Sequence, residues 1–146
     1  MRVLRAELTL DIACAADEVF AYLTDVEKLP EWQGSVVTSR VDGPLCEGAR
    51  IVERRSLLGR EAETELEVTA YEPGRRFALR SLRGPIELTI DHDLDEVGGQ
   101  TRLHVAATAK PSGLLRFAGR AVEARARQEL HRDFERLKKN LEAVRA

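Results

Sequence analysis

The last helix of this chain can be recognised in residues 130–144, which read LHRDFERLKKNLEAV. Its apolar residues follow one another at intervals of four, three, four and three: Leu130, Phe134, Leu137, Leu141 and Val144. This spacing places them in one stripe along an α-helix. Because such a stripe must be covered, we expect the helix to dock on a second apolar surface.

The preceding residues are expected to form that surface as a β-sheet. In residues 61–70, glutamates at alternate positions separate Ala62, Thr64, Leu66, Val68 and Ala70. This period of two is typical of a strand with one buried face, and residues 3–12 alternate in the same way. Further strands are predicted near 35–42, 50–58, 75–83, 86–95 and 101–110. Short Gly- and Pro-containing turns separate most of these strands, which indicates antiparallel hairpins.

Two short helices are predicted between the first two strands. Residues 15–24 have helical spacing, with Val19 and Leu23 as the expected buried pair. Asp25 is expected to cap a second short helix that runs into Trp32. The predicted order is therefore one strand, two short helices, six strands and one long helix.

Composition restricts the class of protein. The 146 residues are 43% hydrophobic and 33% charged with a net charge of −2, which favours a single globular domain over residues 1–146. No basic cluster suggests nucleic-acid binding, and no apolar run is long enough for a membrane span. Cys14 and Cys46 are expected to be free thiols in a reducing cytoplasm, although a disulfide between them stays open. We expect no cofactor, and either a monomer or a homodimer.

These elements predict an α+β protein in which a curved antiparallel sheet of seven strands wraps the C-terminal helix and leaves a cavity beneath it. Several local motifs are similar to those of one known superfamily. They are VFAYLTD (19–25), LPEW (29–32), YEPGRRF (71–77), GGQTRL (98–103) and LKKNLE (137–142).

Together with the element order, these motifs resemble the helix-grip fold of the START and Bet v 1-like (SRPBCC) superfamily. The resemblance is to its bacterial polyketide cyclase/dehydrase and lipid-transport branch in particular. It implies a cavity that binds a hydrophobic small molecule, lipid-like or polycyclic. A minority of such proteins catalyse cyclisation or dehydration in the cavity, and fold alone does not choose between the two roles.

His92 is the first candidate for a polar group inside the cavity. It shares the inner face of its strand with Ile90 and Leu94, whereas His104 should face outward. An inward imidazole can act as an acid, a base or an anchor for a ligand. The alternative is a core histidine that is hydrogen bonded to a backbone carbonyl.

The upstream part of the long helix supplies further candidates. At 100° per residue, Gly119, Glu123 and Arg127 continue the line of the apolar stripe. Glu123 and Arg127 could orient a polar group of the ligand, and Gly119 would leave room under the helix. Alternatively, a kink near Gly119 turns the pair into solvent.

Three other residues are expected near the cavity. Trp32 either closes the mouth of the cavity or packs against the sheet. Phe77 and Ser81 share the inner face of one strand, and Ser81 is expected to make space rather than act as a nucleophile. A metal site is not expected, because His92, His104 and His131 are far apart in sequence.

The sequence leaves three functions open, in this order of preference. The first is non-enzymatic binding of a hydrophobic ligand. The second is an aromatase/cyclase or dehydratase, with His92 or Glu123 as the proton-transfer group and Arg127 polarising a carbonyl. The third is a stress or toxin-type regulator that acts on a protein partner. Nucleophile elbow, metalloprotease and nucleotide-binding motifs are absent from the sequence.

Overall fold

The structure is a computed structural model that describes residues 3–57, 59–111 and 119–145. Its elements, in chain order, are β1 (Leu4–Ile12), α1 (Ala16–Leu23), η1 (Val26–Glu31), β2 (Val36–Val41), β3 (Arg50–Leu57), β4 (Arg60–Glu72), β5 (Arg76–Arg83), β6 (Ile86–Val97), β7 (Gln100–Pro111) and α2 (Gly119–Arg145). The predicted order of strands and helices is confirmed, with element ends within a few residues of those expected.

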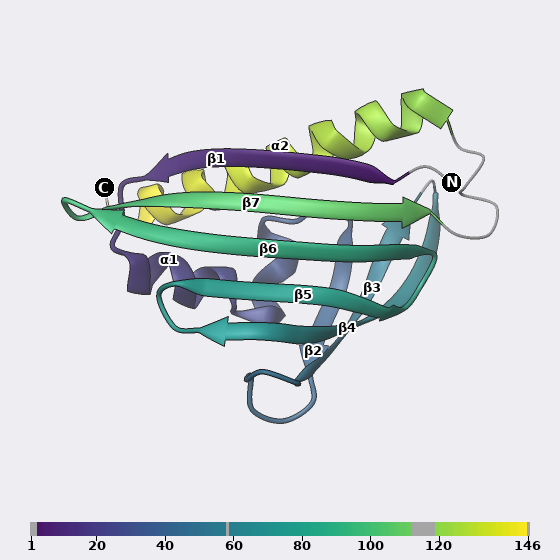
Figure 1. Cartoon of the computed structure of the whole chain (residues 1–146), viewed down its shortest axis with the longest axis horizontal. Helices are drawn as coiled ribbons and strands as arrows, with labels where there is room; N and C mark the ends of the chain where they lie inside the picture. The colour runs from purple at the N-terminus through teal and green to yellow at the C-terminus, as the bar shows by residue number, and fades with distance from the viewer. Residues whose placement is uncertain (1–2, 58, 112–118, 146) are drawn as a thin grey trace.

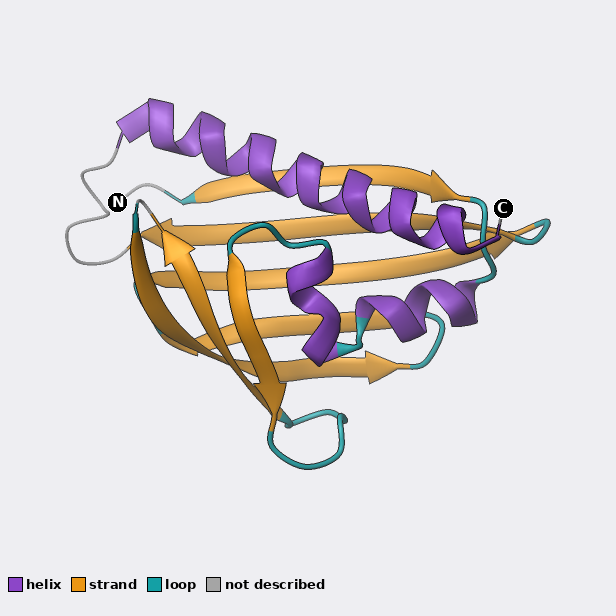
Figure 2. Cartoon of the chain, turned by 180° about the vertical axis from the view of Figure 1, so that it is seen from behind, coloured by secondary structure: helices purple, strands orange, loops and turns teal. Residues whose placement is uncertain are grey.

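The strands form one seven-stranded antiparallel sheet in the order β1-β7-β6-β5-β4-β3-β2. Figure 1 looks onto the outer face of this sheet, with the helices behind it. From the other side, α2 lies along β1 and β7, and β2 and β3 cross the remaining strands steeply (Figure 2). The sheet thus curls around α2, and α1 and η1 lie on the same concave side. This arrangement is the helix-grip fold.

The C-terminal half of α2 fills the concave side of the sheet. Phe134, Leu137 and Leu141 are buried in the core, and Leu130 packs against it partly exposed. The expectation that Leu130 is buried is thus met only in part, and Val144, the last apolar residue at this spacing, is 86% exposed. Leu141 is the last residue of α2 in the core cluster, and the helix continues beyond it to Arg145.

The two short helices close one end of the concave side. Val19 and Leu23 of α1 are buried as predicted, and the ring of Phe20 meets that of Tyr71 edge-on at 5.4 Å. The expectation that Asp25 caps η1 with its side chain is wrong, although Asp25 does occupy the N-cap position. Its carboxylate instead lies 3.8 Å from the ammonium group of Lys28.

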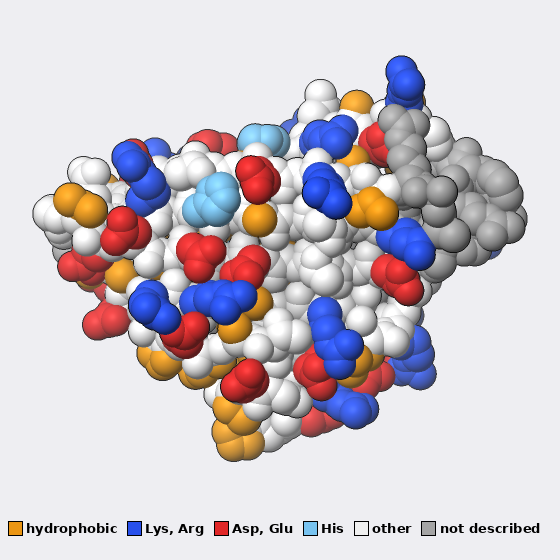
Figure 3. Space-filling model, in the orientation of Figure 1, with side chains coloured by type: hydrophobic (Ala, Val, Ile, Leu, Met, Phe, Trp, Pro, Cys, Tyr) orange, Lys and Arg blue, Asp and Glu red, His pale blue; other side chains and the backbone are white. Residues whose placement is uncertain are grey.

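The outer face of the sheet is covered by charged side chains of both signs (Figure 3). Many of them pair across neighbouring strands, as do Arg80 with Glu67 at 2.8 Å and Arg102 with Asp11 at 2.9 Å. Exposed pairs of this kind contribute little to stability, but their mixture leaves no broad field of one sign. Among the described residues, no helix has the length and apolarity that a membrane crossing requires.

Candidate ligand-binding cavity

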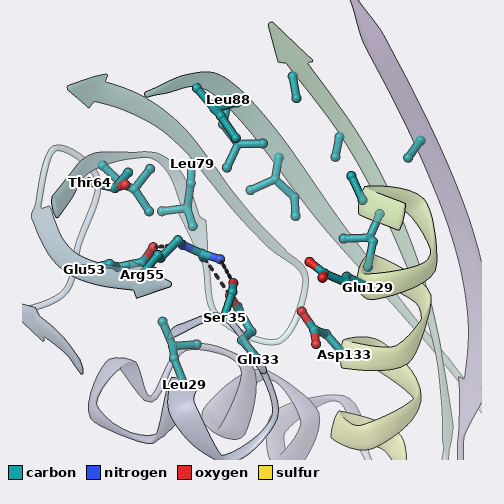
Figure 4. A pocket seen from close by; sticks show the side chains of 18 of the residues that line it. Leu29, Gln33, Ser35, Glu53, Arg55, Thr64, Leu79, Leu88, Glu129 and Asp133 are labelled. Atoms are coloured by element: carbon teal, nitrogen blue, oxygen red, sulfur yellow. Dashed lines mark hydrogen bonds and ion pairs between the residues drawn. The ribbon is translucent and has the colours of Figure 1, made fainter. Parts of the chain in front are cut away.

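A cavity of about 240 Å³ lies between the concave face of the sheet and α2. Its walls are largely apolar, because inner-face residues of β1 and β3 to β7 meet the stripe of α2 there. Representative lining residues are Leu29, Leu79 and Leu88, which Figure 4 labels, and Ile51, Leu66 and Leu130. Apolar walls with a few polar groups are typical of sites for small hydrophobic molecules.

A polar cluster interrupts the apolar wall where β3 faces the η1–β2 connection. Arg55 donates from Nε to Oε1 of Glu53, from Nη1 to Oγ of Ser35 and from Nη2 to Oε1 of Gln33, each at 2.8 Å (Figure 4). Glu53 is only 2% exposed, so its negative charge requires the guanidinium beside it. Three hydrogen bonds therefore hold Arg55 in one position on the cavity wall.

Two carboxylates of α2 face Arg55 from the opposite wall, as Figure 4 shows. Asp133 accepts a hydrogen bond from the backbone N–H of Gly34 at 3.1 Å and lies 3.7 Å from Arg136. Burial raises the pKa of Asp133 above its ordinary value, although the Gly34 hydrogen bond and the nearby arginines oppose this shift. Glu129, half-exposed at the rim, pairs with Arg125 at 3.3 Å.

Arg55 and Asp133 approach one part of the cavity from opposite sides without closing it. Within the part of the chain that the structure describes, the one ion pair of Arg55 is with Glu53, and the one ion pair of Asp133 is with Arg136. A ligand group placed between Arg55 and Asp133 would therefore meet a fixed cation on one side and a carboxyl group on the other.

His92 is buried, lines the cavity and points inward as the strand pattern predicts. Its Nδ1 lies 2.8 Å from the carbonyl oxygen of Phe77, and because a carbonyl only accepts, Nδ1 carries the proton. Burial lowers the pKa of His92 to about 4, so the ring is neutral near pH 7. The ring also stacks on Phe77 at 5.7 Å. The backbone-bonded core histidine considered as the alternative is therefore the observed arrangement.

Trp32 and Phe77 also line the cavity, as expected from the sequence. Trp32 is 1% exposed and its ring lies 5.1 Å from that of Phe134, so it packs in the core as well. Its indole N–H has no hydrogen-bond partner among the described residues. Such an unpaired buried donor is uncommon in folded proteins.

Arg127 reaches the lining at the exposed end of the cavity. Its guanidinium donates to the carbonyl oxygen of Arg5 at 3.0 and 3.3 Å, which joins α2 to β1. Glu123, one turn upstream, is half-exposed and is not among the lining residues. Of the two members of the predicted polar pair, Arg127 therefore lines the cavity and Glu123 does not.

Gly119 and Ser81 also lie outside the lining. Gly119 is the first residue of α2, where a side chain would meet no atom of the described residues within 4 Å, and the cavity does not reach it. The cavity meets α2 only from Ala126 onward. The hydroxyl of Ser81 accepts a hydrogen bond from the backbone N–H of Leu88 at 2.8 Å, which ties β5 to β6.

The polar cluster was missed from the sequence, although two signals could have revealed it. Glu53 and Arg55 share the inner face of β3 with Ile51, as the period of two requires. With Leu130 at zero, Asp133 projects at about −60°, on the flank of the apolar stripe. Of the residues that the structure describes, no three His, Cys, Asp or Glu side chains are grouped to hold a metal ion.

The comparisons with known proteins agree with this geometry. The family model described as "Polyketide cyclase / dehydrase and lipid transport" matches residues 4–142. The search of curated proteins finds no match. A START superfamily protein of Mycobacterium smegmatis is 14% identical, with a TM-score of 0.81 over 96% of this chain and 98% of that chain.

Two solved structures carry aromatase/cyclase names. The Zhui aromatase/cyclase of Streptomyces sp. R1128 is 18% identical, with a TM-score of 0.68 over 98% of this chain and 92% of that chain. The di-domain ARO/CYC StfQ of the steffimycin biosynthetic pathway is 17% identical, with a TM-score of 0.76 over 97% of this chain and 52% of that chain. Identities this low show the shared fold alone. The family assignment comes from the family model, whose match spans nearly all of the sequence: the chain belongs to the polyketide cyclase / dehydrase and lipid transport family.

Proposed function

We propose that the protein binds a small hydrophobic molecule with one polar end in the cavity beneath α2. The observation that carries this proposal is the division of the cavity wall into a large apolar part and a polar cluster around Arg55. Apolar walls supply affinity, whereas a few fixed polar groups orient the ligand.

The volume of the cavity limits the size of the ligand. An apolar cavity of about 150 Å³ holds benzene, and most ligand pockets measure roughly 300–1,000 Å³. At about 240 Å³, this cavity suits a compact molecule of one or two rings better than a long acyl chain. A bicyclic aromatic compound is therefore the appropriate first probe.

The binding proposal is tested by filling the cavity from β7. Ala107 lines the cavity, whereas its neighbour Ala106 is not among the lining residues. Ala107→Leu should abolish one-site binding of a naphthalene-sized probe, measured by calorimetry, and Ala106→Leu should leave it intact. Equal binding by the Ala107 and Ala106 variants would contradict the proposed site.

A second candidate function is an aromatase/cyclase or dehydratase reaction. The observation in its favour is that Arg55 and Asp133 converge on one part of the cavity. In such a reaction Arg55 would polarise a carbonyl, and Asp133, whose pKa burial raises, would transfer a proton. Asp133→Asn should then remove turnover of a polyketide-like substrate and spare its binding. His92→Phe tests the role of the imidazole in the same assay.

A regulator that acts on a protein partner receives less support. The large apolar side chains exposed in the described residues do not share one element: Val3 precedes β1, and Val37, Leu82, Val97 and Val144 lie on β2, β5, β6 and α2. Scattered single residues are normal on a protein surface, whereas a partner-binding face usually has a contiguous patch. The cavity therefore remains the best-supported site.

A further inference from the structure

We infer that the ligand carries a neutral hydroxyl group, as an alcohol or a phenol, which sits between Arg55 and the carboxyl groups of Asp133 and Glu129. This inference rests on the proposed binding function and adds the chemical class of the ligand's polar end. It follows from the hydrogen-bonding capacity that the polar cluster leaves unused.

Arg55 has donors left over for a ligand. A guanidinium carries five N–H groups, and three of those on Arg55 are taken by Glu53, Ser35 and Gln33. One N–H on each terminal nitrogen therefore remains. Because the three existing bonds fix the guanidinium, these donors are already in place before a ligand arrives.

The opposite wall has an acceptor left over. The Gly34 hydrogen bond and the Arg136 contact both involve Oδ1 of Asp133, so Oδ2 has no hydrogen-bond or ion-pair partner among the described residues. Glu129 adds a second carboxylate at the rim, on the same side of the cavity (Figure 4). A ligand group in this position can therefore accept from Arg55 and donate to Asp133 at the same time.

The charges of the two walls argue against a carboxylate or an ammonium group as the polar end of the ligand. A carboxylate on the ligand would accept from Arg55 but would be placed against the carboxyl groups of Asp133 and Glu129. An ammonium group would satisfy those carboxyl groups but would be placed against the guanidinium of Arg55. Like charges brought together in a partly desolvated site are strongly unfavourable. A hydroxyl group, which both donates and accepts without a net charge, satisfies both walls.

The test uses four ligands that share one naphthalene body: 2-naphthol, 2-naphthoate, 2-naphthylmethylammonium and 2-methylnaphthalene. Binding to the full chain is measured by calorimetry at pH 7. We expect 2-naphthol to bind at least about tenfold more tightly than each of the other three, since only it pairs both polar walls. Equal or tighter binding of the naphthoate or the ammonium compound would overturn the inference.

Variants identify the residues responsible for the preference. Asp133→Asn removes the carboxylate charge and should reduce the preference for 2-naphthol over 2-naphthoate to less than about threefold. Glu135→Gln removes a carboxylate from an exposed position of α2 nearby and should leave the preference unchanged. The double variant Glu53→Gln/Arg55→Gln should reduce the preference for 2-naphthol over 2-methylnaphthalene, with folding checked by circular dichroism. A full preference in Asp133→Asn would contradict the assigned role of Asp133.

The two proposals fail in different ways. If 2-methylnaphthalene binds wild type and is excluded by Ala107→Leu, the cavity binds apolar molecules whatever its preference for a hydroxyl group. Absence of that preference then overturns only the inference. If none of the four compounds binds folded protein, the binding function for molecules of this size is overturned together with the inference.

Discussion

The ring of Trp32 lies 5.1 Å from the ring of Phe134 at a tilt of 56°, and this contact joins the end of η1 to the middle of α2. Both side chains are buried, and both line the cavity. Phe134 also lies 5.7 Å from the ring of His92 on the sheet. The docking of α2 and the shape of the cavity therefore depend on the same residues.

Replacement of Phe134 by alanine should strongly destabilise the protein. Removal of a buried phenylalanine ring costs about 3–5 kcal/mol, because transfer energy is lost and a cavity remains. Urea denaturation followed by the fluorescence of Trp32, the one tryptophan of the chain, measures the change beside the substitution. A loss of less than about 1 kcal/mol would show that α2 does not depend on this contact.

His92 should make the protein less stable in mild acid. Its pKa is lowered to about 4 in the folded state by burial, against an ordinary value of 6.5. The unfolded chain therefore binds more protons between these values, so stability is full above pH 6.5 and declines as the pH falls toward 4. The loss amounts to about 3 kcal/mol at 1.36 kcal/mol per pKa unit.

The acid dependence is measured by urea denaturation at several pH values between 7 and 4, in wild type and in His92→Phe. The variant lacks the imidazole, so its stability should decline less over this interval. Asp133, whose pKa burial raises, changes stability in the opposite direction in both proteins, and the comparison removes its contribution. Parallel curves for the two proteins would contradict the assignment to His92.

The buried pair of Glu53 and Arg55 should be more sensitive to the loss of one partner than of both. Arg55→Gln leaves the carboxylate of Glu53, which is 2% exposed, without its cation. We expect a loss of roughly 3 kcal/mol, as is usual when a buried ion pair is broken from one side. Glu53→Gln/Arg55→Gln removes both charges and should recover much of that loss.

A double-mutant cycle of Glu53→Gln, Arg55→Gln and their combination measures the coupling directly. Additive single effects would show that the pair contributes no coupling energy at this site. The same double variant is used in the binding test. Its free energy of unfolding therefore shows whether a change in ligand affinity is accompanied by a loss of fold stability.

The fold could be predicted from the sequence because its signals are local. Alternation along residues 61–70 and the four-three spacing from Leu130 each determine which face of one element is buried. The end of the stripe could not be predicted in this way. Whether Val144 is covered depends on where the core ends in space, and the helical period continues whether or not a partner surface is present.

The candidate site was only partly predictable for a related reason. His92, Phe77 and Arg127 line the cavity, as the faces of their own elements predict, and Trp32 lines it as well. The cluster around Arg55 depends on contacts between β3 and the η1–β2 connection, which no single element reveals. The line of the apolar stripe on α2 leads upstream to Glu123, whereas the polar residue that lines the cavity, Asp133, lies on the flank of that stripe.

The two halves of α2 should differ in local stability. Residues 119–129 include no buried side chain, whereas the half that follows includes Phe134, Leu137 and Leu141. A helical segment with little buried apolar surface opens more readily than one held in the core. Amide hydrogen exchange should therefore be faster in residues 119–129 than in residues 130–141.

Arg127 provides the means to test what holds the upstream half in place. Its two hydrogen bonds to the carbonyl oxygen of Arg5 are exposed, so Arg127→Ala should lower global stability by less than about 1 kcal/mol. Exchange in residues 119–129 should nevertheless accelerate, because this half of α2 loses a contact to β1. Arg125→Ala is the matched control: it removes an arginine that pairs with Glu129 within the same helix and leaves the contact to β1 intact. Equal acceleration in both variants would show that loss of an arginine, rather than of the bridge to β1, loosens the helix. A large global destabilisation by Arg127→Ala would instead show that both halves of α2 unfold as one unit.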